Sequence, residues 1–322
     1  ELIESGFEYF AGGAFISPTG KKGDQEDLYK IARDKGYKVV TKQKEAEKLS
    51  AKDGKAIVIA ETLADGDSFS YEIDARDDEW KLADYVKKGI EILYNDKGFF
   101  MMVEGGKIDW ACHANDAATT IHDTIALSNA VEVAIEFYNK HPRDTLILVT
   151  GDHETGGLSI GFAGTNYDTF LTNLSNQKIS YAKFDSDYVA KYKKNGTKFP
   201  EVLKDIESNF GLVAKNNAKS STNPNLILTD YEYKKLYEAY RITMDEYRQL
   251  DEEQYILYGT YEPLTVTITH ILNNKSGIAF SSYAHTGLPV PVYALGNGAE
   301  LFEGHYDNTD IYLKMAELTS VK

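Results

Sequence analysis

Three short segments combine carboxylates and imidazoles at spacings that could hold a metal ion. In the first, VEGGKIDWACH over residues 103–113, Asp109 and His113 lie four residues apart. Two glycines let the backbone turn into a predicted helix, on which both side chains would project from one face. A carboxylate oxygen and an imidazole nitrogen at that spacing can share one zinc ion. A helix N-terminal aspartate and a core histidine would give the same pattern, so this segment alone leaves both interpretations open.

The second segment places an Asp-His pair at the end of an apolar strand. Residues 146–150 read LILVT and run, after one glycine, into Asp152 and His153. Active sites of open α/β sheets lie outside the carboxyl ends of the strands, where this pair would stand. In the third segment, His285 lies in a loop that leads into the predicted strand 290–295. Each of these two segments is weak evidence by itself, because polar loops and solvated histidines are common.

The elements around these segments predict an α/β fold. Apolar runs of strand length, such as 56–60 (AIVIA) and 99–103 (FFMMV), alternate with amphipathic helical patterns. Continuous apolar strands of this kind are typical of a mainly parallel sheet with helices on both faces. A long helix is predicted after the Asp109 segment, with Ile121, Ile125 and Ala134 on its inner face.

The pattern changes between about residues 161 and 262. Strand-like runs disappear, Tyr, Lys, Asp and Asn accumulate, and the stretch 231–250 looks helical and heavily charged. The sequence therefore predicts an α/β core over 1–160, a mostly helical insertion over 161–262 and a return to the core over 263–322.

Composition narrows the classes of function. The formal charge of the 322 residues is −15, which disfavours a nucleic-acid-binding surface. Metal ions can still invert the local field of an acidic protein and attract anionic substrates. The single cysteine, Cys112, excludes an internal disulfide. No apolar run is long enough to cross a bilayer, and no signal peptide is visible.

Taken together, the three segments resemble the metal-binding pattern of the alkaline phosphatase family. The resemblance extends from Ala11-Gly12-Gly13 to the tail 304–309 and leaves out only the insertion. It implies an alkaline-phosphatase-like α/β fold, here truncated at the N-terminus, because residues 1–6 read like the last turns of a helix. The metal ligands that it implies are Glu104 for one magnesium ion, Asp109, His113 and His285 for the first zinc ion, and Asp152 and His153 for the second.

The resemblance also implies an activity, hydrolysis of phosphate monoesters through a phosphoserine intermediate. No catalytic residue is assigned in this chain, because the family's serine nucleophile and phosphate-binding arginine are expected upstream of Glu1. We therefore expect a fragment that is inactive alone, derived from a periplasmic or secreted enzyme. We expect phosphate monoesters as its partners, with self-association or a homodimer, and neither nucleic acid nor a membrane.

Other functions stay open at this stage. A phosphodiesterase or a phosphoglycerate-mutase-like member of the same superfamily would use similar elements, although Glu104 favours a monoesterase. A sulfatase would need a modifiable Cys or Ser followed by Pro and Arg, whereas Cys112 leads into His113 and Ala114. A non-catalytic protein in which metals stiffen a binding scaffold is the remaining alternative.

Overall fold

The computed structural model describes residues 1–245 and 251–319, which form two compact units. Unit 1 comprises Glu1–Gly105, Ile125–Asp152 and Val290–Lys322, and unit 2 comprises Gly106–Thr124 and His153–Pro289. The domain bounds 1–160, 161–262 and 263–322 stay a prediction. Among the described residues, no helix is both long and apolar enough to span a membrane.

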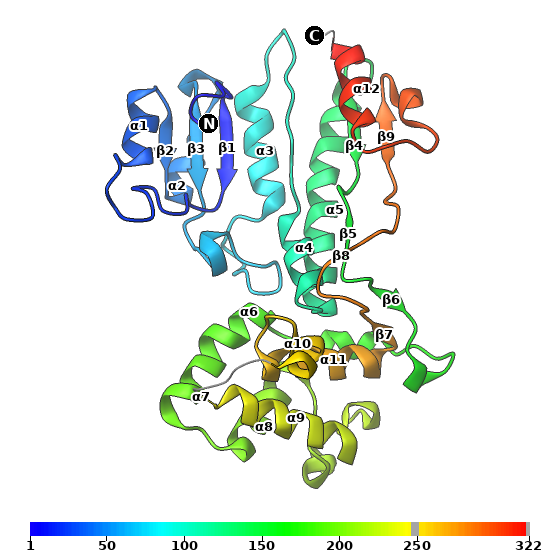
Figure 1. The fold of residues 1–322 in the computed structure, drawn as a ribbon. Helices are drawn as coiled ribbons and strands as arrows, with labels where there is room; N and C mark the ends of the chain where they lie inside the picture. The colour runs from blue at the N-terminus through cyan, green and yellow to red at the C-terminus, as the bar shows by residue number, and fades with distance from the viewer. Residues whose placement is uncertain (246–250, 320–322) are drawn as a thin grey trace. The chain divides into compact units, whose positions relative to one another are not determined.

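Unit 1 contains a three-stranded parallel sheet in the order β1-β3-β2 (Figure 1). Its strands are β1 (Tyr9–Gly12), β2 (Lys38–Val40) and the central strand β3 (Ala56–Ile59), which is buried at every residue. Burial on both faces explains why the central strand is apolar throughout.

Helices cover both faces of this sheet, as the sequence predicts. On one face, Val58 of β3 packs with Ala46 of α2 (Gln43–Ala46) and Ile92 of α3 (Leu82–Leu93). On the other, Ile57 of β3 packs with Ala32 of α1 (Leu28–Asp34), a helix capped by the Asp27 side chain.

The remainder of unit 1 supplies the strand that leads toward Asp152. Strand β4 (Leu146–Val149) pairs antiparallel with β9 (Tyr293–Gly296), so that Val149 lies opposite Tyr293. The unit also includes helix α12 (Asp310–Thr319) and helix α5 (Ala117–Lys140) from Ile125 onward.

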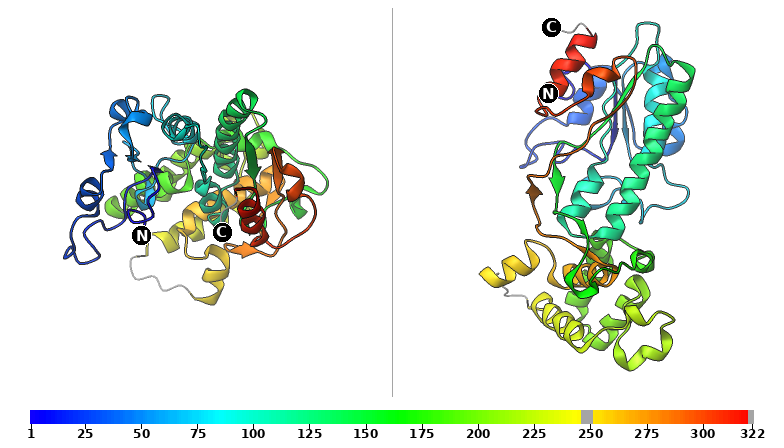
Figure 2. Two further views of the ribbon diagram at one scale, coloured as in Figure 1. Left: turned by 90° about the horizontal axis from the view of Figure 1, so that it is seen from above. Right: turned by 90° about the vertical axis from the view of Figure 1, so that its right-hand side faces the viewer.

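Unit 2 joins two short β-ribbons to a body of helices, seen again from two further directions in Figure 2. Strand β5 (Glu154–Thr155) pairs antiparallel with β8 (His285–Thr286), and β6 (Ser159–Ile160) pairs antiparallel with β7 (Ile278–Ala279). Helix α4 (Gly106–His113) and the first residues of α5 complete the part that carries Asp109, His113, His153 and His285.

We call residues 161–276 of unit 2 the helical body. Its core is built around α11, in which Leu264, Ile268 and Leu272 are completely buried. The neighbouring helix α9 begins with a capping box formed by Thr229 and Glu232, which satisfies its first free N–H groups. The helices of the body are α6 (Tyr181–Phe184), α7 (Ala190–Asn195), α8 (Phe199–Phe210), α9 (Asp230–Thr243), α10 (Glu252–Tyr258) and α11 (Pro263–Ser276).

Two predictions about individual elements are wrong. Residues 99–103 form no strand, and Phe100 and Met102 are 64% and 71% exposed, because this run pairs with no other strand among the described residues. Ile121 and Ile125 lie on the exposed side of α5, whose buried side carries the small residues Ala126 and Ala130 instead.

The predicted helix 231–250 ends as α9 at Thr243, and residues 246–250 lie outside the described residues.

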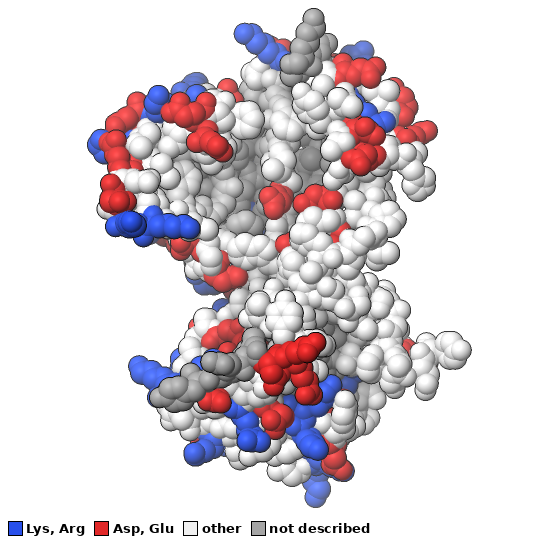
Figure 3. Space-filling view, viewed as in Figure 1, with Lys and Arg blue, Asp and Glu red and all other residues white. Residues whose placement is uncertain are grey.

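Charged side chains are interspersed over the face shown in Figure 3. On that face, the Lys and Arg residues drawn in colour lie among Asp and Glu and do not gather into one basic surface. This distribution agrees with the acidic balance of the sequence.

Candidate metal centre

Helix α4 presents the first two ligand candidates on one face. Asp109 lies in its first turn and His113 is its last residue, so the four-residue spacing brings the side chains together. The distance from His113 Nε2 to Asp109 Oδ1 is 3.4 Å.

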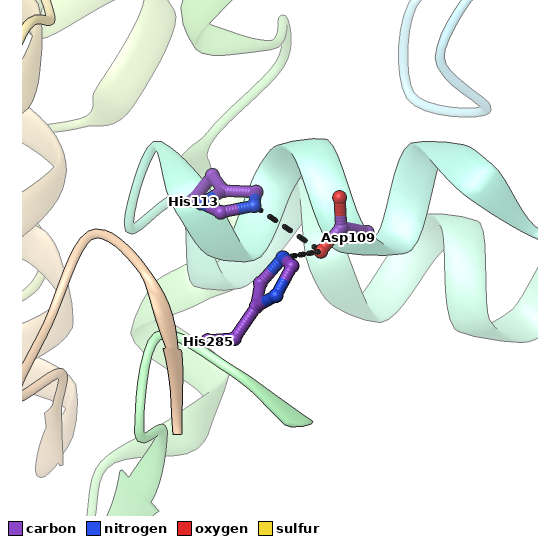
Figure 4. Close-up of side chains that lie close together, drawn as sticks. All are labelled: Asp109, His113 and His285. Carbon is purple, nitrogen blue, oxygen red and sulfur yellow. Dashed lines mark ion pairs between the residues drawn. The ribbon is translucent and has the colours of Figure 1, made fainter. Parts of the chain in front are cut away.

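The β5–β8 ribbon brings the third candidate to the same place. His285 begins β8 opposite Thr155, and its Nε2 lies 4.0 Å from Asp109 Oδ1. Asp109, His113 and His285 each offer one ligand atom, and these atoms all lie within 4.8 Å of one another (Figure 4). We call these three residues the ligand cluster; all of them belong to unit 2.

Hydrogen bonds orient two members of the ligand cluster. His113 Nδ1 lies 2.6 Å from the carbonyl oxygen of Tyr283. A carbonyl can only accept, so Nδ1 carries the proton and the lone pair of Nε2 is left for a metal. The hydroxyl of Thr155 donates to Asp109 Oδ1 at 2.6 Å, which holds that carboxylate in place.

His153, which precedes β5, lies against the ligand cluster. Its ring stacks on that of His285, with the centroids 3.4 Å apart and the planes 20° apart. The Thr155 Oγ1 atom lies 3.2 Å from His153 Nδ1. Because the single hydroxyl proton of Thr155 is used on Asp109, this oxygen can only accept a hydrogen bond from His153.

Glu104 and Asp152 belong to unit 1, and both side chains are exposed. Glu104 stands two residues before the start of α4, and Asp152 follows β4 and immediately precedes His153. Their roles as metal ligands stay predictions.

A second layer of contacts fixes the loop that carries His285. Asn115, in a left-handed conformation just after α4, donates through Nδ2 to the carbonyl oxygens of Cys112 and Ser282, each at 2.9 Å. Its Oδ1 accepts from His270 Nε2 at 2.9 Å, and burial lowers the pKa of His270 to about 4. On the ribbon itself, the Glu154 carboxylate accepts from the Thr286 hydroxyl and from the backbone N–H of Gly157.

The donor set of the ligand cluster fits zinc. One carboxylate and two imidazoles form a common three-ligand set that leaves a position open for water or substrate. The side chains of Asp109, His113 and His285 are 35%, 24% and 52% exposed, so the cluster can be reached from solvent. The supporting contacts to His113 and Asp109 are of the kind that orient metal ligands.

Comparison with known proteins agrees with the resemblance seen in the sequence. The family model described as alkaline phosphatase matches residues 6–321, nearly the whole chain. The chain belongs to the alkaline phosphatase family.

Individual alkaline phosphatases show how much of the family pattern the chain covers. Alkaline phosphatase 3 of Bacillus subtilis (strain 168) is 31% identical over 291 residues, which cover 89% of this chain and 54% of that protein. The crystal structure of the cold-active enzyme from the psychrophile Shewanella sp. has a TM-score of 0.73 and 26% identity, covering 99% of this chain and 67% of that one. The structure of a mutant TAB5 alkaline phosphatase with Mg bound in its M3 site has a TM-score of 0.57 and 22% identity, covering 99% of this chain and 62% of that one.

Two facts follow from these matches. The alkaline-phosphatase-like α/β fold is confirmed over the described residues. The chain spans about half the length of the curated relatives it matches, 54% and 52% for the two Bacillus subtilis enzymes.

Some residues of the site escaped the sequence analysis. The hydrogen bond from the Thr155 hydroxyl to Asp109 has no signal in the sequence, because it depends on the fold that brings β5 to α4. Tyr181 and Tyr261 line an open cavity of about 370 Å³ together with Asp109, Trp110 and His113, all within unit 2. Both tyrosines lie in the predicted insertion, where no spacing pattern links them to the ligand motifs.

Proposed function

We propose that this chain provides the first zinc site of a metal-dependent phosphomonoester hydrolase. The observation that carries the proposal is the convergence of Asp109, His113 and His285, which come from two elements about 170 residues apart, on one point. When bound there, zinc would supply Lewis-acid stabilisation to an oxygen of the phosphate ester.

The chain's own residues prepare that site. The Tyr283 carbonyl holds the proton of His113 on Nδ1, and the Thr155 hydroxyl holds the Asp109 carboxylate. Both ligands therefore need little reorientation when an ion arrives. We extend the proposal to a second zinc ion at Asp152 and His153 and to a magnesium ion at Glu104. The stacking of His153 on His285 supports the former, and membership of the alkaline phosphatase family supports the latter.

Membership of the family also suggests the substrates and the location of the protein. We propose phosphate monoesters as substrates and export to the periplasm or outside the cell. We further propose self-association, because the apolar side chains of Phe100 and Met102 are exposed. Sedimentation at several concentrations tests this last point, and a monomer throughout would contradict it.

The decisive experiment compares monoester and diester hydrolysis. In the longest natural polypeptide that contains these 322 residues, p-nitrophenyl phosphate should be hydrolysed much faster than bis(p-nitrophenyl) phosphate. Asp109→Ala should remove most of the zinc-dependent rate. Faster hydrolysis of the diester would identify a phosphodiesterase instead. We expect the 322-residue chain alone to bind about one zinc ion and to hydrolyse the monoester no faster than a metal-free control.

A further inference from the structure

Three aromatic residues, which we call the aromatic wall, line the cavity beside the ligand cluster. Of its five lining residues, Asp109 and His113 belong to the cluster, and the other three are the aromatic residues Trp110, Tyr181 and Tyr261. Trp110 follows Asp109 on α4, Tyr181 begins α6, and Tyr261 lies between α10 and α11. Aromatic residues from three separate segments therefore line one cavity next to the ligand cluster.

Contacts with neighbouring groups hold these rings in place. The backbone N–H of Tyr181 donates to the buried Asp116 carboxylate at 2.9 Å. The rings of Tyr181 and Tyr261 meet edge to face, with centroids 6.0 Å apart. Tyr261 also lies 5.8 Å from the ring of Tyr283, the residue whose carbonyl orients His113. Tyr283 therefore contacts both the aromatic wall and the ligand cluster. This shared contact favours binding of a ligand without rearrangement of either.

Trp110 is held from a different side. The Lys107 ammonium lies 4.5 Å from the centroid of its ring, within the range of a cation–π contact. The side chain remains 38% exposed, so part of the indole stays accessible.

We propose that this cavity is the subsite for the organic part of the phosphate ester and that it favours an uncharged aromatic group. This inference rests on the proposed function, because a phosphoryl group at the ligand cluster would place its organic group beside Asp109 and His113. Aromatic walls bind flat rings by stacking and edge-to-face contacts.

Size and charge narrow the class of substrate. A volume of about 370 Å³ is near the lower end of the roughly 300–1,000 Å³ usual for small-molecule sites. It suits a single ring system, such as a phenol or a nucleobase. Among the described lining residues none is a lysine or arginine, and the nearby Lys107 is buried against Trp110, so the wall offers no exposed cation to an organic group with further negative charge.

The test measures binding of two phosphonates to the zinc-loaded 322-residue chain. Phenylphosphonate and methylphosphonate carry the same head group, and their carbon–phosphorus bonds are not hydrolysed by a phosphatase. We expect calorimetry to show phenylphosphonate binding about fivefold to tenfold more tightly, the order of one aromatic contact. In a Trp80→Phe background, Trp110 is the only tryptophan, so its fluorescence should respond to phenylphosphonate more than to methylphosphonate.

Variants assign the effect to the wall. Tyr181→Ala and Tyr261→Ala should each bring the two affinities close together through loss of phenylphosphonate binding, while Tyr261→Phe keeps the ring and the preference. Tyr167→Ala is the matched control, because Tyr167 belongs to the same body but is fully exposed. Thermal unfolding of each variant separates loss of the wall from loss of the fold, and Tyr261→Phe reports on the wall even if an alanine variant unfolds.

The outcomes separate the two proposals. A chain that fails to bind zinc overturns the proposed function and this subsite together. A zinc-loaded chain that binds both phosphonates equally, or binds neither, overturns the subsite and leaves the zinc site standing. A phenyl preference that survives both alanine variants places the aromatic contact elsewhere and also overturns the subsite.

Discussion

Ionisable side chains are candidate metal ligands in the ligand cluster of unit 2, whereas in the helical body burial favours their neutral forms. In the cluster, Asp109, His113 and His285 remain between 24% and 52% exposed. In the helical body, Asp185 and His270 are half-buried, and burial raises the pKa of Asp185 to about 7 and lowers that of His270 to about 4. Both shifts favour the neutral form, because burial penalises charge.

The difference shows how the unit separates binding from structure. Neutral groups in the helical body act as hydrogen-bond partners, as when His270 donates to Asn115 or the Thr265 hydroxyl donates to Asp185. In the ligand cluster, neutral groups such as the Thr155 hydroxyl and the Tyr283 carbonyl orient the ligands, whose side chains stay partly exposed. An ion can then replace water at the cluster without disturbing the core. Substitutions in the two regions test this separation of metal binding from structure.

Removal of a ligand should have the largest effect. His285→Ala deletes one of three protein ligands, and we expect zinc affinity to fall by about 100-fold or more, since loss of a mere supporting contact already costs about 10–100-fold. The side chain is half exposed, so thermal stability without metal should change little. Competition with a chelator of known affinity measures the effect. His122→Ala, at an exposed position of α5 in unit 2, is the control and should leave zinc affinity unchanged. Equal affinities for the two variants would remove His285 from the site.

Asp185→Asn should stabilise the chain at alkaline pH. The folded pKa of Asp185 is raised, so its contribution to stability is complete below the unfolded value of 3.8 and is lost as the pH rises through about 7. The full shift corresponds to roughly 4 kcal/mol, of which we expect about 2 kcal/mol to be recovered, because asparagine accepts a weaker hydrogen bond from Thr265 than a carboxylate does.

Urea unfolding at about pH 5 and about pH 8 measures this difference. The advantage of Asp185→Asn over the wild type should grow with pH, with the nearby charges of Glu262 and Lys193 left in place. Asp168→Asn, an exposed position of the same helical body, should show no such trend. A constant difference at both pH values would mean that Asp185 is not held neutral by burial.

Thr155→Val should weaken zinc binding by about tenfold, less than the loss of a ligand. Valine keeps the volume of this buried residue but lacks the hydroxyl that donates to Asp109. The carboxylate then loses its orienting contact, and changes of this kind cost about 10–100-fold in metal affinity. Thr155→Ser keeps the hydroxyl and should retain most of the affinity. If serine and valine weaken binding equally, the hydrogen bond is not what orients Asp109.

The sequence alone predicted some parts of the site and not others. The four-residue spacing of Asp109 and His113 correctly placed both on one helical face, because helix geometry is local. Nothing local could bring His285 to them, since its position depends on the pairing of β5 with β8 over about 130 residues. That step came from the resemblance to a family. Tyr181 and Tyr261 had no sequence signal, because they reach the cavity through the packing of the helical body.

Strand prediction shows the same limit. The runs at 56–59 and 99–103 are both apolar, but only the first lies between two neighbours, β1 and β2. A strand needs partners for its backbone groups, and composition does not say whether they are there. On α5 the error had another cause: small residues such as Ala126 and Ala130 allow close packing, so the larger Ile121 and Ile125 were left on the exposed side.

Cys112 offers the smallest expected effect and the sharpest contrast within one helix. It is adjacent to His113 in sequence, and a thiolate would be a strong zinc ligand. However, Cys112 is only 8% exposed, its Sγ lies 3.6 Å from Thr120 Oγ1, and burial raises its pKa to about 11. It therefore belongs to the buried side of α4, like the groups of the helical body, and stays a thiol at neutral pH.

Cys112→Ala should accordingly leave zinc affinity unchanged within error, even though the substitution is next to a ligand. In the native chain, the thiol should react with a disulfide reagent far more slowly than in urea, where its protection is lost. Cobalt substitution gives an independent reading, since a bound thiolate would produce a sulfur-to-cobalt charge-transfer band. Its appearance, or rapid labelling of the native chain, would place Cys112 in the ligand cluster and break the division between the exposed and buried faces of α4.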